Sequence, residues 1–147
     1  MEVERSFYLV ESPITCTKVN FTGNGNETLN VDITYKTPWR RTISSASYDA
    51  DMYYEPGTIN MILKTNLPFF VARLTPGSGK YVVLDTDYEQ SALIYSCINW
   101  RFVHADFVWV LGRKMEISPE MRVKMYSILD KYNINRDRLF ISSRNNC

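Results

Sequence analysis

The sequence has few of the residues that build metal and nucleophile sites. It contains one histidine and three cysteines among 147 residues. The cysteines are Cys16, Cys97 and Cys147, and none of them has the short ligand spacing of a zinc site. A single histidine cannot complete such a site with them by any local pattern, so we expect no metal centre and no cofactor.

Three further absences exclude other classes of protein. Lys and Arg are scattered and the formal net charge is only +1, so a nucleic-acid partner has little support. No apolar run approaches the roughly 20 residues of a membrane-spanning helix, so no transmembrane segment is expected. No apolar segment follows a basic start, so this chain shows no signal peptide.

What the sequence does contain is a series of short apolar runs separated by turn residues. With 45% apolar residues, the chain can bury one core of ordinary size, so we expect a single domain over residues 1–147. The stretch 80–113 carries the clearest runs, YVVL, ALIY and FVWVL, which are β-branched or aromatic and apolar on both parities. Each is typical of a strand that is covered on both faces.

The same pattern predicts about eight strands over the whole chain. Turn signals such as the one at 23–26 separate the runs. The further strands are expected at residues 2–10, 15–21, 28–36, 41–54 and 58–65. No segment with a helical period occurs before Ser118. Many short strands are typical of an up-and-down barrel or of a sandwich, and the pattern alone barely separates the two.

A single helix is expected near the carboxyl end of the chain. Ser118 is a typical N-cap residue, and Pro119 is favoured at the first helical position. The apolar residues that share one helical face are Met121, Met125, Ile128, Leu129 and Tyr132. Arg122 and the other charged residues are expected away from that face. A last short strand is predicted at 139–141.

Three motifs in the central stretch occur in an order that is characteristic of one family. They are Asp-Thr-Asp-Tyr at 85–88, Ala-Leu-Ile-Tyr-Ser-Cys at 92–97 and His-Ala-Asp-Phe-Val-Trp at 104–109, followed by Arg113. Together they resemble the second and third conserved regions of the lipocalins. Within that family the sequence looks most similar to the branch of apolipoprotein D, Lazarillo and the insect bilin-binding proteins, and the likeness continues to Cys147.

The resemblance implies an all-β fold, an eight-stranded antiparallel up-and-down β-barrel with one C-terminal α-helix packed outside. It also implies an incomplete first strand, because the family's G-x-W motif does not appear before Glu2. In the family pattern Cys16 pairs with Cys147, whereas the partner of Cys97 is absent here and leaves Cys97 unpaired. Such a disulfide implies a secreted, extracellular protein. A cytosolic protein with three reduced cysteines is the alternative.

The resemblance gives structural rather than catalytic roles to the motif residues. Thr86, Asp87 and Tyr88 are expected in a turn at the bottom of the barrel, where Asp87 can cap backbone donors. Arg113 could attract a ligand carboxylate, but in the family this arginine stacks on the tryptophan of the first motif. Without that tryptophan the chain is expected to be destabilised. His104 is predicted in a loop.

Two glycosylation sequons predict surface positions. They begin at Asn20 and Asn26, and a chance match is the alternative for each. A glycan cannot enter a core, so if Asn20 is glycosylated its side chain faces outward. Its neighbours Val19 and Phe21 then face inward, because successive side chains of a strand point to opposite faces.

Strand parity predicts which side chains face the inside of the barrel. In the last central strand the smaller Val108, Val110 and Gly112 are expected beneath the helix, which leaves the bulky set inside. The expected ligand-binding residues are Val19, Phe21, Ile59, Met61, Leu63, Tyr81, Val83, Ile94, Phe107, Trp109 and Leu111. The alternative is that these residues pack only against each other.

These features favour a carrier of a small hydrophobic ligand, such as a fatty acid, sterol, retinoid or bilin, held in the barrel. The alternative is a module that binds a protein, lipid or lipoprotein surface through the exposed loop at 67–70. The aromatics of that loop could instead begin an edge strand and pack inward. A lipocalin-type isomerase with a pocket cysteine is a distant third, because Cys16 is expected outward and Cys97 at a strand end. We therefore expect no enzyme activity.

Overall fold

The computed structural model describes residues 1–6, 14–23, 25, 28–37, 40–52, 55–75, 77–100, 103–142 and 147. Within these ranges the strands are β1 (Glu2–Ser6), β2 (Thr15–Gly23), β3 (Thr28–Thr37), β4 (Arg40–Met52), β5 (Thr58–Leu63), β6 (Gly79–Thr86), β7 (Ser91–Trp100), β8 (Val103–Gly112) and β9 (Leu139–Ile141). The helices are α1 (Phe69–Ala72), α2 (Pro119–Lys131) and the 3-10 helix η1 (Arg136–Arg138).

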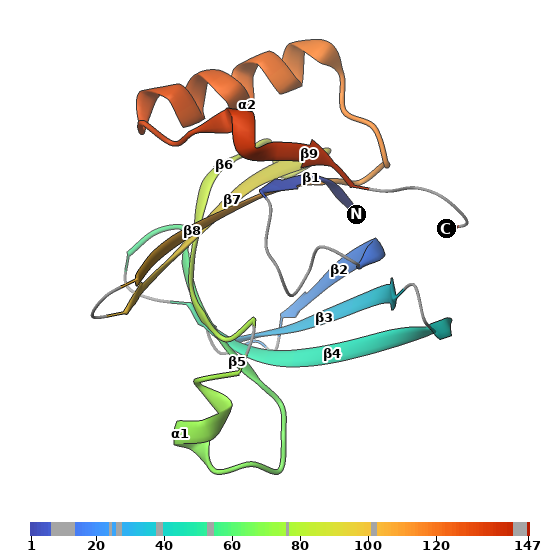
Figure 1. Ribbon diagram of the computed structural model, residues 1–147, viewed down its shortest axis with the longest axis vertical. Helices are drawn as coiled ribbons and strands as arrows, with labels where there is room; N and C mark the ends of the chain where they lie inside the picture. Colours follow the sequence, from blue (N-terminus) through green and yellow to red (C-terminus); the bar gives the residue numbers. More distant parts are fainter. Residues whose placement is uncertain are drawn as a thin grey trace.

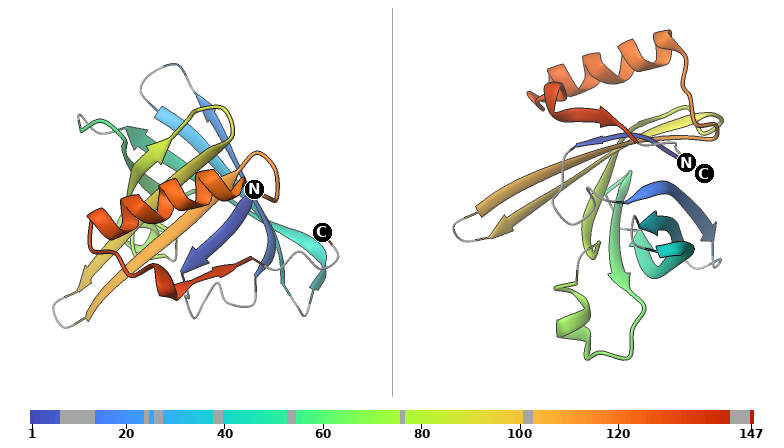
Figure 2. Two further views of the ribbon diagram at one scale, coloured as in Figure 1. Left: turned by 90° about the horizontal axis from the view of Figure 1, so that it is seen from above. Right: turned by 45° about the vertical axis from the view of Figure 1, so that its right-hand side comes forward.

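The strands form one antiparallel sheet that curls back on itself. Their order is β2-β3-β4-β5-β6-β7-β8-β1-β9, so consecutive strands from β2 to β8 are neighbours. In Figure 1 β2, β3 and β4 form the lower wall, and β1 and β9 lie above them next to α2. Figure 2 shows the same curl from two further directions. The predicted all-β, up-and-down barrel architecture is confirmed, and the sandwich alternative is wrong because a single continuous sheet curls around the interior.

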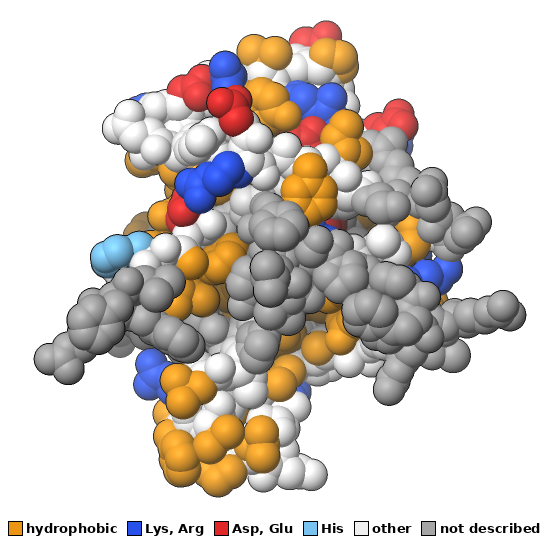
Figure 3. All heavy atoms as spheres, in the orientation of Figure 1, with side chains coloured by type: hydrophobic (Ala, Val, Ile, Leu, Met, Phe, Trp, Pro, Cys, Tyr) orange, Lys and Arg blue, Asp and Glu red, His pale blue; other side chains and the backbone are white. Residues whose placement is uncertain are grey.

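The loop between β5 and β6 folds into α1, a single helical turn that the sequence did not indicate. Its apolar side chains are largely exposed, with Leu67 at 50%, Phe69 at 63%, Phe70 at 70% and Leu74 at 71%. Figure 3 shows hydrophobic side chains gathered at this lower end of the molecule. The alternative in which the loop aromatics pack inward as an edge strand is therefore wrong.

Helix α2 packs on the outer face of the sheet, as predicted. The Ser118 hydroxyl accepts a hydrogen bond from the Met121 N–H at 3.2 Å, and Pro119 takes the first helical position. This cap satisfies a donor that a helix start otherwise leaves unpaired. The helix and the sheet share an outer cluster of fully buried apolar residues, which are Val3, Leu93, Val108, Val110, Met125 and Leu129.

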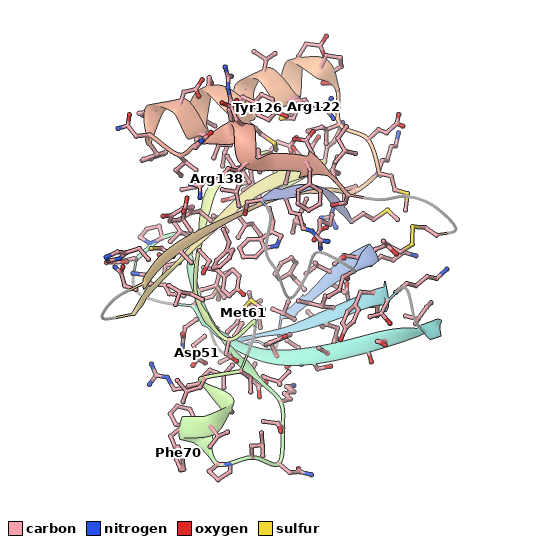
Figure 4. All side chains as sticks on the ribbon, in the orientation of Figure 1. Asp51, Met61, Phe70, Arg122, Tyr126 and Arg138 are labelled. Carbon is pink, nitrogen blue, oxygen red and sulfur yellow. A yellow bond between two sulfur atoms is a disulfide. The ribbon has the colours of Figure 1, made fainter. Side chains whose placement is uncertain are left out.

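The charged face of α2 is only partly exposed, contrary to the prediction for Arg122. Glu4 of β1 points outward beneath the helix and is 2% exposed. Arg122 Nε lies 2.6 Å from Glu4 Oε1, and the Tyr126 hydroxyl donates to Glu4 Oε2 at 2.8 Å (Figure 4). Burial, with Glu4 beside it, raises the pKa of Tyr126. Because a buried carboxylate needs partners, the helix must turn these two polar side chains toward the sheet.

Tyr132 also differs from the prediction, which placed it on the apolar face of α2. Its side chain is 55% exposed, because the helix ends there and Tyr132 is the C-cap residue. The apolar stripe of α2 therefore stops one turn earlier than the sequence period indicated.

The β7–β8 hairpin is longer than predicted. Most of the interval 99–106, which lies between the apolar runs ALIY and FVWVL, is strand. His104 therefore lies in β8, exposed, with its Nδ1 hydrogen-bonded to Asn99 Oδ1 on β7. Cys97, expected at a strand end, lies within β7 and is exposed. The hairpin extends beyond α2 in Figure 1, so polar residues can occupy its uncovered face without ending the strands.

The first strand lies between β8 and β9 rather than at a sheet edge. The pairing of Arg5 with Trp109 on one side and with Phe140 on the other fixes its register. The Arg5 Nη2 group donates to the Ile14 carbonyl at 2.8 Å, which links β1 to the start of β2. The remainder of the predicted first strand, residues 7–10, lies outside the described residues.

The turn between β6 and β7 is organised by one carboxylate, in the capping role predicted for Asp87. Its Oδ1 accepts hydrogen bonds from three backbone N–H groups. These belong to Glu89, Gln90 and Ser91, at 3.1, 2.8 and 2.9 Å. The bonds from Ser91 and Gln90 favour the ionised carboxylate and hold the pKa of Asp87 below its ordinary value. The same turn holds Tyr88 at a φ of +61°.

Cys16 and Cys147 form the disulfide that the resemblance implied, and 131 positions separate them in sequence. The bond ties the start of β2 to the end of the chain. Cys97 is a free cysteine in the structure.

We expect the double variant Cys16→Ser/Cys147→Ser to unfold at a lower temperature than the parent. For a loop of this size the chain-entropy relation gives a loss of about 5 kcal/mol in the free energy of unfolding, and native disulfides typically contribute about 2–5 kcal/mol. Thermal unfolding followed by circular dichroism measures the change. Cys97→Ser is the matched control and should keep the parent midpoint. Equal midpoints for the double variant and the parent would contradict a stabilising role.

Asp87→Ala should lower stability near neutral pH, and the deficit should shrink as the pH falls. The folded-state pKa of Asp87 lies below its ordinary value of 3.8. Its contribution is therefore present above the unfolded-state pKa and is lost as the pH drops through the folded-state pKa. Thermal midpoints over an acid pH series, with the exposed neighbour variant Glu89→Ala as control, measure this. A deficit that does not change with pH would show that ionisation of Asp87 is not the cause.

Candidate functional site

The curled sheet encloses a mostly apolar cavity of about 200 Å³. Small-molecule sites typically measure about 300–1,000 Å³. The cavity therefore suits a small ligand, or a larger one that projects from its mouth.

Seven of the eleven predicted ligand-binding residues line this cavity. They come from β2, β5, β6, β7 and β8, and they meet because each occupies the inward parity of its strand. The register places Ile94 directly opposite Trp109. The seven residues are Val19, Phe21, Met61, Tyr81, Ile94, Trp109 and Leu111.

The other four predicted residues do not line the cavity. Ile59 and Leu63 pack beside an inner cluster that consists of Val31, Tyr48, Ala50 and Met61. Phe107 is 6% exposed and packs against Trp109, with ring centroids 6.0 Å apart. Val83 pairs with Ile94 but is not part of the wall. Parity assigns a side chain to the inner face of the sheet, but it does not say at which depth the interior stays open.

Ten residues of the cavity wall were not among the predicted ligand-binding residues. Those of β3 had a usable signal, because Val31, Ile33 and Tyr35 alternate with polar residues along that strand. Ala46 and Tyr48 of β4 had the same kind of signal, because they alternate with Ser45, Ser47 and Asp49. The ten residues are Glu2, Arg5, Ile14, Thr17, Val31, Ile33, Tyr35, Ala46, Tyr48 and Gly77.

Aromatic rings form one side of the cavity. The Tyr81 and Trp109 rings lie 5.4 Å apart and are tilted by 40°, and the Tyr81 hydroxyl donates to the Gly77 carbonyl at 2.9 Å. Gly77 has a φ of +86°, and a Cβ at this position would collide with the Tyr48 hydroxyl. Only glycine therefore fits where this loop closes on the cavity wall.

Two charged residues of β1 are part of the same wall. Arg5 Nη1 lies 3.2 Å from Glu2 Oε1, and the two side chains are 2% and 3% exposed. The Ser142 hydroxyl donates to Glu2 Oε1 at 2.5 Å. Among the described residues that line the cavity, Glu2 and Arg5 are the charged ones.

A second cavity of about 210 Å³ lies next to the first, at the end of the sheet that the β6–β7 turn closes. The motif residues Thr86, Tyr88 and Arg113 line it, and none of them reaches the main cavity. Arg113 is therefore not placed to anchor a ligand in the main cavity. The residues that line both cavities and so lie between them are Val19, Phe21 and Leu111.

The predicted modification and thiol sites lie outside the cavity. Asn20 is exposed, and its Nδ2 donates to the Thr22 hydroxyl at 3.4 Å. Asn26 lies outside the described residues. Cys97 is exposed, and burial together with a hydrogen bond to this thiol raises the pKa of Tyr95 to about 12.

Over the ranges that the structure describes, no cluster of His, Cys, Asp and Glu side chains could hold a metal ion. Within the same ranges, no helix has both the length and the apolar character needed to cross a membrane.

The curled antiparallel sheet, the enclosed apolar cavity and the external helix define a class of protein, and the sequence agrees with it. Residues 4–146 match the family described as Lipocalin / cytosolic fatty-acid binding protein family. The chain belongs to this family.

Relatives within the family include apolipoprotein D from several mammals. The protein from Bos taurus is 44% identical over 72 residues, which is 48% of this chain and 38% of that protein. The one from Oryctolagus cuniculus is 41% identical over 86 residues, 57% of this chain and 43% of that protein. The chain thus spans less than half the length of these curated relatives. The resemblance to the branch that contains apolipoprotein D is confirmed.

Solved structures of low sequence identity share the fold. Insecticyanin from the tobacco hornworm Manduca sexta superposes with a TM-score of 0.80 at 15% identity, covering 99% of this chain and 76% of that one. H1 crustacyanin from Homarus americanus gives a TM-score of 0.78 at 17% identity, over 99% and 75% of the two chains.

Proposed function

We propose that this protein binds and carries a small hydrophobic ligand in the main cavity. The observation that carries the proposal is an apolar cavity, faced by the rings of Trp109 and Tyr81, inside a lipocalin sheet. Pockets that are mostly apolar with a few polar groups are typical of small-molecule sites. Fatty acids, sterols, retinoids and bilins are the candidate ligand classes.

The cavity supports binding of moderate strength. A ligand that buries about 300 Å² of apolar surface gains roughly 7 kcal/mol at about 25 cal/mol/Å², before the costs of desolvation and ordering. Before those costs are subtracted, this gain corresponds to a dissociation constant in the micromolar range. A shape match or a polar contact would tighten it.

The family favours binding over catalysis, since its description includes the fatty-acid binding proteins. The position of Cys97 also favours binding over catalysis. A catalytic thiol would have to lie inside the cavity, and the thiol of Cys97 lies outside it. An extracellular location is supported by the Cys16–Cys147 disulfide, since such bonds persist in oxidising compartments. In an extracellular protein the exposed sequon at Asn20 would be a site of N-glycosylation.

Filling the cavity should weaken ligand binding without unfolding the protein. Ala46 lines the cavity, and its neighbour Ser45 is exposed on the other face of β4. We expect Ala46→Phe to weaken binding by at least about tenfold, whereas Ser45→Phe should bind like the parent. Titration with fatty acid, sterol, retinoid and bilin probes, read by tryptophan quenching, measures this. Absence of saturable quenching of the parent by every class would contradict the carrier function.

A second function is favoured by the exposed loop around α1. Leu67, Phe69, Phe70 and Leu74 are each at least half exposed, and Arg73 lies with its guanidinium 5.7 Å from the Phe69 ring centroid. Clustered exposed apolar side chains mark interaction surfaces. We infer that this loop contacts a lipid or lipoprotein surface.

The double variant Phe69→Ser/Phe70→Ser should lose association with lipid vesicles while it keeps ligand binding. The exposed aromatics supply the apolar surface that would enter the lipid interface, and neither ring lines the cavity. Vesicle flotation measures the association. Val123→Ser removes an apolar side chain of α2 that is also 68% exposed and serves as control. Equal flotation of the aromatic double variant and the parent would contradict the lipid-surface function.

A further inference from the structure

Strand β1 is fully buried although three of its five residues are charged. Glu2, Glu4 and Arg5 are 8%, 2% and 2% exposed. Glu4 is engaged on the outer side of the sheet, by an ion pair with Arg122 and a hydrogen bond from Tyr126. The two charged residues on the inner side, Glu2 and Arg5, form a separate ion pair. Contact with the helix does not account for their position, and neither does exposure to solvent.

The inner pair is held rigidly from several elements. Arg5 bonds Glu2 at 3.2 Å and the Ile14 carbonyl at 2.8 Å. Its guanidinium also lies 5.3 Å from the centroid of the Phe140 ring of β9. Glu2 in turn accepts a hydrogen bond from Ser142, which follows β9. Such fixed side chains present a constant pattern of charge to anything that enters the cavity.

The charge of the pair sums to zero, with −1 on Glu2 and +1 on Arg5, and the other described residues of the cavity wall are uncharged. An ionised carboxylate that enters must lose its water. It meets a guanidinium whose charge Glu2 already compensates, and the carboxylate of Glu2 repels it. A hydroxyl or carbonyl group loses far less hydration and can still use the polar atoms of the pair.

We propose that the Glu2–Arg5 pair makes the cavity selective for uncharged amphiphiles, such as long-chain alcohols, ketones or esters, over ionised fatty acids of the same chain. The inference rests on the proposed carrier function and narrows its ligand class. Glu2 acts as the specificity-determining residue, because its negative charge cancels the attraction that Arg5 would otherwise exert on an anion.

Three ligands with one common chain test the selectivity on the parent protein. Dodecanol, methyl dodecanoate and dodecanoic acid are compared by competition against a bound neutral fluorescent probe, at a pH far above the ordinary carboxyl pKa. We expect the alcohol and the ester to bind at least tenfold more tightly than the ionised acid. Equal or tighter binding of the acid would overturn the selectivity while leaving the carrier function in place. Failure of all three ligands, and of the probe, to bind would overturn both.

The variant Glu2→Gln tests whether the Glu2–Arg5 pair causes the selectivity. It keeps the size of the side chain and a hydrogen-bond acceptor for Ser142, but it leaves Arg5 with a net positive charge in the wall. We expect the preference for the alcohol over the acid to fall at least tenfold. Glu89→Gln, in the exposed β6–β7 turn, is the matched control and should keep the parent preference.

A folded Glu2→Gln protein with an unchanged preference would overturn the assignment to Glu2. If the variant does not fold, the comparison of the three ligands on the parent protein still decides the selectivity.

Discussion

The guanidinium of Arg5 holds the two ends of the curled sheet together. Both edges of β1 are occupied, by β8 and β9, and among the described residues no strand ladder joins β1 to β2. The Arg5 side chain reaches the Ile14 carbonyl next to β2 and the Phe140 ring of β9. The Cys16–Cys147 disulfide adds a covalent link from β2. Because Arg5 also lines the cavity, the residue that makes this connection is part of the proposed ligand-binding surface.

The division of apolar residues into two clusters explains how a hollow interior is tolerated. The outer cluster between α2 and the sheet contains Met125 and Leu129, neither of which is exposed at all. The inner cluster around Val31 and Met61 fills only part of the lumen. Unfilled interior volume lowers stability, so a barrel with an open cavity depends on packing elsewhere. Here the external helix provides that packing, and the Cys16–Cys147 disulfide contributes further stability.

Local patterns in the sequence were enough to predict the strands, the C-terminal helix and which side chains of β2 and β8 face the interior. Val19, Phe21, Trp109 and Leu111 line the cavity because strand alternation is a local property of the backbone. The depth of the cavity is not local. Val83 has the same parity as its wall partners and is still outside the cavity, since the curvature of the whole sheet decides where space remains.

Charged residues gave the sequence reasoning its main errors, and for one reason. A charged side chain is assigned to the surface unless a partner is known, and the partners here are far away in sequence. Glu4 meets Arg122, and Glu2 meets Ser142. No window of local sequence contains either pair, so Arg122 was expected away from the helix face that packs on the sheet. Glu2 and Arg5 were not recognised as part of the cavity for the same reason.

The position of β1 also has a consequence for biogenesis. Glu4 pairs with Ile141, so a strand made early finds one of its neighbours 137 residues later. At the usual elongation rate of about 5–20 residues per second, this takes roughly 7–27 s. During that interval the nascent chain carries a strand edge with no partner from β9, and such edges invite aggregation. The topology that finally conceals this strand thus leaves one of its edges uncovered for nearly the whole synthesis of the polypeptide.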